Sequence, residues 1–93
     1  MIILPSKPRA AIATHAVADY PNEACGLLLG QRRGEDMIVS QAVASTNVAD
    51  EPSHRFAIDP GLRLRLQKVA RSGAAQILGH YHSHPDGAAQ PSK

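Results

Sequence analysis

A chain of 93 residues with a mass of 9.9 kDa has room for one small domain, and therefore for one site or none. Apolar residues make up 43% and charged residues 19%, which excludes intrinsic disorder for the chain as a whole. The formal charge of +2, with one Phe, two Tyr and no Trp, argues against nucleic acid as a partner.

The cysteine content and the hydropathy of the sequence indicate where in the cell the protein is expected. The single cysteine, Cys25, excludes an internal disulfide and a four-cysteine zinc site, and the reducing cytoplasm is the default location. The apolar start at residues 1–5 is too short for a signal peptide, and no run approaches the ~20 apolar residues that span a bilayer. We therefore expect a cytoplasmic protein that makes no contact with a membrane.

The first predicted element is an Ala-rich helix that begins near Ser6. Ile12, Ala16 and Tyr20 recur at four-residue spacing, and Pro21 follows directly and ends the pattern. A helix so rich in alanine is expected to pack closely against a sheet.

A hairpin is predicted next. The apolar run 24–29 is short and is followed by glycine, which favours a buried strand over a helix. Residues 31–35 have the composition of a polar turn, and 37–44 contain enough Ile, Val and Ala to form the return strand. Residues 45–54 are predicted to be a loop and 55–58 a short third strand.

The second predicted helix has a local start signal, because Asp59 can cap it and Pro60 can open it. Leu62, Leu66 and Val69 form one apolar stripe on this helix. The basic residues on its other face are most simply a solvated surface, although they could also meet an acidic partner; they are Arg63, Arg65, Lys68 and Arg71.

The last predicted strand covers residues 76–82, after Ser72 and Gly73 have ended the helix. The order helix, hairpin, strand, helix, strand predicts an α/β sandwich in which helices flank a mixed sheet. The residues after Pro85 have no apolar pattern and are expected to form a loop.

Three of the five histidines lie within five positions, at His80, His82 and His84. On a strand, side chains at i and i+2 share a face ~6.6 Å apart, whereas i and i+4 are ~13 Å apart. A metal-binding pair is therefore either His80 with His82 or His82 with His84, and the spacing does not choose between them. A half-exposed histidine face on an edge strand accounts for the same pattern without a metal.

A wider set of motifs resembles the JAMM (MPN-plus, JAB) metalloprotease family, as a small prokaryotic-type member. The matching blocks are Pro-Asn-Glu-Ala-Cys-Gly-Leu-Leu-Leu-Gly at 21–30, Asn47, Phe-Ala-Ile-Asp-Pro at 56–60 and Gly-His-Tyr-His-Ser-His-Pro at 79–85. The family signature is a glutamate before a Cys-Gly strand, then His-x-His, seven residues, Ser, two residues and Asp. The resemblance implies a cytidine-deaminase-like MPN sandwich.

Residue by residue, the resemblance implies that His82 and His84 are zinc ligands and that Glu23 is the catalytic base. Seven residues separate His84 from Ser92, which the resemblance makes the hydroxyl beside the reacting carbonyl. Without the resemblance, Glu23 would be interpreted as a solvated residue between a helix and a strand.

The aspartate ligand of the family signature would lie two positions after Lys93. We therefore expect residues 1–93 to form a single JAMM/MPN domain that is incomplete at its C-terminus. Asp86 is the nearest substitute carboxylate, but it lies two residues from His84 behind the rigid Pro85.

The implied function is a zinc-dependent metallopeptidase or isopeptidase. It hydrolyses an amide or isopeptide bond at the C-terminal Gly-Gly tail of a ubiquitin-like or sulfur-carrier protein, using metal-activated water. The alternative is a non-catalytic MPN-type module that binds ubiquitin-like partners. A thiol mechanism at Cys25 is disfavoured because a cysteine in an apolar strand is usually inert. The sequence leaves a homo-oligomer open.

Overall fold

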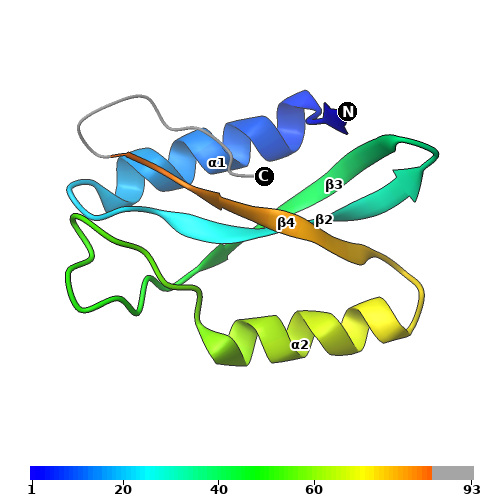
Figure 1. Ribbon diagram of the computed structural model, residues 1–93. Coiled ribbons are helices and arrows are strands. Elements are labelled where there is room, and N and C mark those ends of the chain that lie inside the picture. Colours follow the sequence, from blue (N-terminus) through cyan, green and yellow to red (C-terminus); the bar gives the residue numbers. More distant parts are fainter. Residues whose placement is uncertain (85–93) are drawn as a thin grey trace.

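The computed structural model describes residues 1–84. Its elements, in chain order, are β1 (Ile2–Ile3), α1 (Ser6–Asp19), β2 (Cys25–Arg33), β3 (Asp36–Ser45), α2 (Pro60–Arg71) and β4 (Gln76–His82). The four strands form one sheet in the order β1-β3-β2-β4, in which β1 is parallel to β3 and the other neighbours are antiparallel. The helices α1 and α2 lie on opposite sides of this sheet (Figure 1). The predicted α/β architecture with a mixed sheet flanked by helices is confirmed.

The helix α1 covers one face of the sheet and buries two residues, Pro8 and Ile12. Ile12 is 5% exposed and packs with Leu28, Val39 and Tyr81 in the core cluster. The predicted stripe is buried only in part, because Tyr20 at its end is 63% exposed. Tyr81 also ties the sheet to the helix, since its hydroxyl lies 2.8 Å from His15 Nδ1. Burial raises the pKa of Tyr81 to about 12, so its hydroxyl stays protonated at neutral pH.

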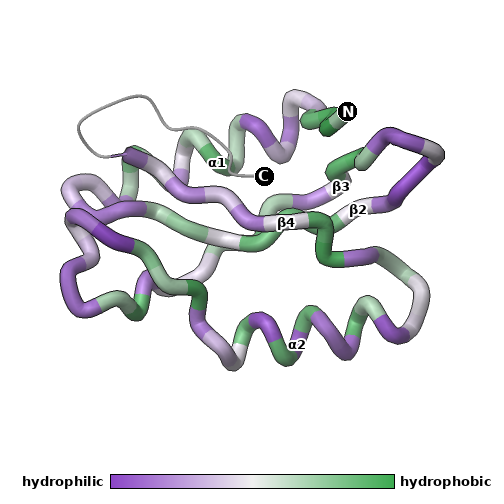
Figure 2. Tube along the Cα trace, viewed as in Figure 1, coloured by the Kyte–Doolittle hydropathy of each residue, from purple (hydrophilic) through white to green (hydrophobic). Residues whose placement is uncertain are grey.

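The helix α2 begins where its sequence signals predict. The Asp59 carboxylate accepts a hydrogen bond of 3.0 Å from the Gly61 N–H, and Pro60 occupies the first turn. Along α2, hydrophobic and hydrophilic residues alternate (Figure 2). Leu62 is buried, whereas Val69 is 43% exposed, so the predicted stripe contacts the rest of the fold mainly at its N-terminal end. Neither helix within residues 1–84 is long and apolar enough to cross a membrane.

The hairpin is confirmed, but its turn is tighter than predicted. Residues 31–33 belong to β2 and pair with 36–38 of β3, so the interpretation of 31–35 as a polar turn is wrong. Gly34 has φ 60°, the left-handed conformation that two-residue hairpin turns require. Polar residues can extend the strands here because residues 31–35 are all exposed. The tip of the hairpin is accordingly hydrophilic (Figure 2).

Two short segments differ from the prediction. The strand predicted at 55–58 is wrong, because these residues make only an isolated bridge between Ile58 and Asn47. Conversely, β1 was not predicted, and it pairs in parallel with Met37 and Ile38 of β3. Both outcomes depend on partners far along the chain, which local composition does not reveal.

Gly26 allows the two central strands to pack against the ring of Tyr81. A Cβ atom placed on Gly26 would collide with the Tyr81 ring and with the carbonyl oxygen of Val43. Since Tyr81 is 2% exposed and Val43 would have to move its backbone, little relaxation is available.

Replacing Gly26 with Ala should therefore lower the free energy of unfolding by about 3 kcal/mol. Urea denaturation followed by circular dichroism measures this loss. The matched control is Gly61→Ala, because a Cβ there would meet its neighbours only at 3.5 Å, an ordinary contact, in the first turn of α2. Equal stability of the two variants would contradict the prediction.

Candidate metal centre

The pairing of β2 with β4 places the start of one strand beside the end of the other. Cys25 pairs with His82 in this antiparallel register. Beyond the last strand pair, the Ser83 N–H donates to the Ala24 carbonyl at 2.9 Å, and the Ala24 N–H donates to Ser83 Oγ at 2.8 Å. Ser83 is 6% exposed. These two bonds extend the contact between the chains to the point where Glu23 precedes β2.

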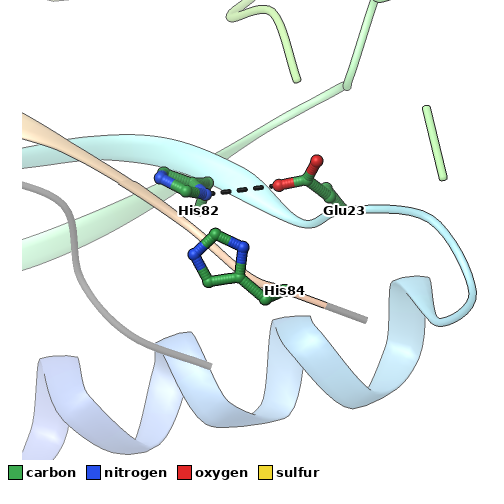
Figure 3. A group of neighbouring side chains, drawn as sticks. All are labelled: Glu23, His82 and His84. Carbon is green, nitrogen blue, oxygen red and sulfur yellow. Dashed lines mark hydrogen bonds and ion pairs between the residues drawn. The ribbon is translucent and has the colours of Figure 1, made fainter. Parts of the chain in front are cut away.

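Three potential metal ligands meet at this end of the sheet. Glu23, His82 and His84 each offer one ligand atom, and these atoms lie within 4.8 Å of one another. His82 and Glu23 come from adjacent strand ends, and His84 lies close to both (Figure 3). The rings of His82 and His84 meet edge to face, with centroids 4.7 Å apart.

The geometry distinguishes between the two histidine pairs that the spacing had left open. Within residues 1–84, the group with metal-binding geometry contains His82 and His84 and leaves out His80. The ring of His80 instead packs near Phe56, with centroids 5.5 Å apart. Burial lowers the pKa of His80, and the nearby His82 and Arg63 lower it further, which favours a neutral imidazole.

The Glu23 carboxylate is unusually buried for an acidic side chain. It is 7% exposed, and its Oε1 lies 3.2 Å from His82 Nδ1. An ionised carboxylate can only accept a hydrogen bond, so the donor in this contact is the Nδ1–H group of His82. A buried carboxylate needs such a partner, or a cation, to offset the loss of hydration. The arrangement therefore presents one buried acid and two imidazoles to the same small space.

Two further residues shape this space, and the sequence analysis assigned no role to either. The Phe56 ring stacks on His82, with centroids 4.3 Å apart and planes at 12°. Ser83 joins the two strand ends, as described above. Both residues lie inside the motif blocks, but only the fold shows what they touch.

Cys25 lies next to the centre in the register but is not available as a nucleophile. Its side chain is completely buried, and its Sγ lies 3.9 Å from the Ala57 carbonyl oxygen. Burial raises the pKa of the Cys25 thiol, an effect only partly opposed by a hydrogen bond from Ser45. A buried thiol with a raised pKa supplies little thiolate at neutral pH.

Two residues considered in the sequence analysis lie outside the described residues. Ser92 and Asp86 both fall within 85–93, so the roles considered for them have no structural test. The catalytic and ligand roles predicted for Glu23, His82 and His84 also stay predictions, although these three side chains do lie together.

A groove of about 590 Å³ lies beside the centre, between α2 and the end of β4. Its lining comes from His80 of β4, from Phe56 of the connection before α2, and from Pro60, Arg63 and Leu64 of α2. Leu64 is 59% exposed, so the groove offers an apolar surface with one cation next to the metal centre.

Comparison with known proteins agrees with the geometry. Residues 5–93 match the model of a family described as prokaryotic homologs of the JAB domain. The solution structure of protein DSY2949 from Desulfitobacterium hafniense is 39% identical, with a TM-score of 0.84, and the match covers 99% of this chain and 62% of that chain.

Three curated relatives are of similar distance. Desampylase of Haloferax volcanii is 31% identical over 96% of this chain and 66% of its own length. A probable TtuB-protein conjugate cleaving protease of Thermus thermophilus is 32% identical over 84% and 49%, respectively. The CysO-cysteine peptidase of Mycobacterium tuberculosis is 31% identical over 89% and 55%. The chain spans about half to two thirds of the length of these relatives, and it belongs to the family of prokaryotic JAB-domain homologues.

Proposed function

We propose that the protein hydrolyses an amide or isopeptide bond at the C-terminal Gly-Gly tail of a ubiquitin-like or sulfur-carrier protein. The observation that carries this proposal is the convergence of the buried Glu23 carboxylate with His82 and His84. The names of three relatives support it, since they describe a desampylase, a TtuB-conjugate protease and a CysO peptidase.

The donor set fits Zn²⁺. Imidazole nitrogens and carboxylate oxygens are ligands of this ion, and three such atoms lie within 4.8 Å of one another. His82 and His84 would hold the ion through their imidazole nitrogens. When bound, Zn²⁺ supplies a Lewis acid that activates water and polarises the scissile carbonyl.

Glu23 has the position and surroundings of a general base. Its carboxylate lies beside the imidazoles and is 7% exposed, so it can take a proton from the attacking water and pass it to the leaving amine. The hydrogen bond to His82 fixes the orientation of the carboxylate. The proposed role of Ser92 is to donate a hydrogen bond to the carbonyl oxygen as negative charge develops on it.

The substrate is proposed to bind as an extended tail along β4. This strand lies at the edge of the sheet formed by the described strands, so its outer backbone groups can pair with a peptide. The groove beside it, lined by Leu64 and Arg63, can receive apolar and acidic side chains of the carrier. Glycine residues suit the approach to the buried centre because they need no space for a side chain.

The test is cleavage of a ubiquitin-like protein that ends in Gly-Gly and is joined to a lysine peptide through an isopeptide bond. Mass spectrometry should show a cut directly after Gly-Gly. Removal of the metal with 1,10-phenanthroline should lower the rate roughly 100-fold or more, and added Zn²⁺ should restore it, since a Lewis acid is worth several kcal/mol.

Iodoacetamide should leave the rate unchanged, because Cys25 is buried and its pKa is raised. Turnover that survives chelation would overturn the metal-dependent mechanism. Binding of the carrier without turnover would instead support a non-catalytic module.

A further inference from the structure

Asn47 lies at the start of the long connection between β3 and α2. Its side chain forms hydrogen bonds with the segment before β2 and with the later part of this connection. The carboxamide Nδ2 donates hydrogen bonds to the carbonyl of Glu23 at 3.0 Å and to the carbonyl of Arg55 at 2.9 Å. A longer contact of 3.4 Å reaches the Pro52 carbonyl. Both hydrogens of the amide are thus directed at backbone oxygens, one of which belongs to the proposed base.

The other half of the same carboxamide accepts hydrogen bonds. Asn47 Oδ1 accepts from the backbone N–H groups of Ala49 and Ala57, each at 3.1 Å. Since backbone N–H groups only donate and carbonyls only accept, no other orientation of the amide satisfies these partners. An aspartate of the same shape would turn two donors into acceptors that face carbonyl oxygens.

These bonds bracket Phe56. The carbonyl before it and the N–H after it, on Arg55 and Ala57, are both bound to the Asn47 side chain. The Phe56 ring in turn stacks on His82, with centroids 4.3 Å apart and planes at 12°. Asn47 therefore holds the backbone on both sides of Phe56, the residue whose ring packs against His82.

Glu23 is held by the same connection at both of its backbone groups. Its carbonyl accepts from Asn47, and its N–H donates to the Pro52 carbonyl at 2.7 Å. The Glu23 carboxylate and the His82 ring lie 3.2 Å apart at their nearest atoms. Asn47 thus contacts the Glu23 backbone directly and reaches the His82 ring through the Phe56 ring that stacks on it.

We propose that Asn47 is a positioning residue of the metal centre, whose carboxamide sets the placement of the Glu23 backbone and of the Phe56 ring against His82. Its effect on hydrolysis rests on the proposed function, whereas its effect on geometry does not. A residue that only stabilised the connection would not alter the placement of Glu23 relative to His82. A substitution of Asn47 would then lower stability without changing the environment of the His82 ring.

The first measurement uses the protein without metal. The Phe56 ring shields the protons of the stacked His82 ring, so the His82 Cε1–H resonance should lie upfield of its usual position. The variant Phe56→Leu removes the ring and gives the full size of this shift. We expect Asn47→Asp and Asn47→Ser each to lose more than half of it while retaining a folded amide spectrum.

The second measurement uses the zinc-loaded protein and the Gly-Gly isopeptide substrate. Both Asn47 variants should lower kcat by about 10- to 100-fold, because small displacements of reacting groups carry penalties of this size. KM should change by less than about twofold, since the carrier-binding surface is untouched.

The matched control is Gln31→Glu. This amide also donates to a backbone carbonyl, that of Ala74 at 3.0 Å, but near the opposite end of the β2–β4 pair. The control should change neither the His82 resonance nor kcat.

The proposal is overturned if the Asn47 variants keep the His82 resonance and the kcat of the parent protein. It is also overturned if both variants unfold, because Asn47 then maintains the fold rather than the centre. If the parent protein shows no hydrolysis, the proposed function fails, while the resonance measurement still decides whether Asn47 positions His82.

Discussion

Replacing Glu23 with Gln is expected to slow hydrolysis of the isopeptide substrate by roughly 100- to 10,000-fold, the usual contribution of a positioned general base. Glutamine has nearly the same shape and can still accept a hydrogen bond from His82, so the fold and the bound metal should be retained. The measurement is kcat with the Gly-Gly substrate, together with the zinc content of the same sample. The expected loss lies in kcat rather than in KM.

The control for this substitution is Glu35→Gln, which removes one negative charge at the exposed hairpin turn. It should leave kcat unchanged, because a solvated charge distant from the centre has little effect in physiological salt. A Glu23→Gln variant with more than about a tenth of the parent rate would show that another group takes the proton. Loss of zinc from this variant would instead indicate that Glu23 ligates the metal.

Replacing His84 with Ala is expected to weaken zinc binding by roughly 100-fold or more, because groups that merely orient a ligand already contribute 10- to 100-fold. His84 is exposed, so its removal should leave the packing of the sheet intact. Competition with a chromophoric chelator measures the affinity. Hydrolysis at low zinc concentration should fall in parallel.

His80→Ala is the informative comparison for this experiment. The spacing alone makes His80 as good a ligand as His84, but its ring packs beside Phe56 and lies outside the group whose atoms converge. We therefore expect His80→Ala to bind zinc within a few-fold of the parent protein. Equal losses in the two variants would contradict the proposed ligand pair.

Local signals explain which elements could be predicted from the sequence. Asp59 and Pro60 act within one turn of the helix that they start, and the predicted bounds of β4, 76–82, agree with the observed Gln76–His82. The polar residues Gln31–Arg33 misled the turn prediction, because an exposed ribbon accepts polar residues as readily as a loop does.

The remaining errors concern partners distant in sequence. Residues 55–58 look like a strand, but the Asn47 side chain takes hydrogen bonds at 55 and 57 that a neighbouring strand would otherwise make. For the candidate site, the histidine spacing left two pairs open, and only the family resemblance pointed to Glu23, His82 and His84. The structure brings His82 and His84 together with Glu23 at the start of the adjacent strand, a neighbour that no periodicity within 76–84 encodes.

The hydrogen bond between His82 and Glu23 joins positions that are 59 residues apart in the chain. These groups come together only when β2 and β4 have paired. A metal ion bound at both strand ends would therefore stabilise the native state alone. In so small a domain, which buries little surface, a bound metal would hold the start of β2 against the end of β4. The melting temperature should therefore rise with the concentration of free metal, because metal binding and folding are linked equilibria.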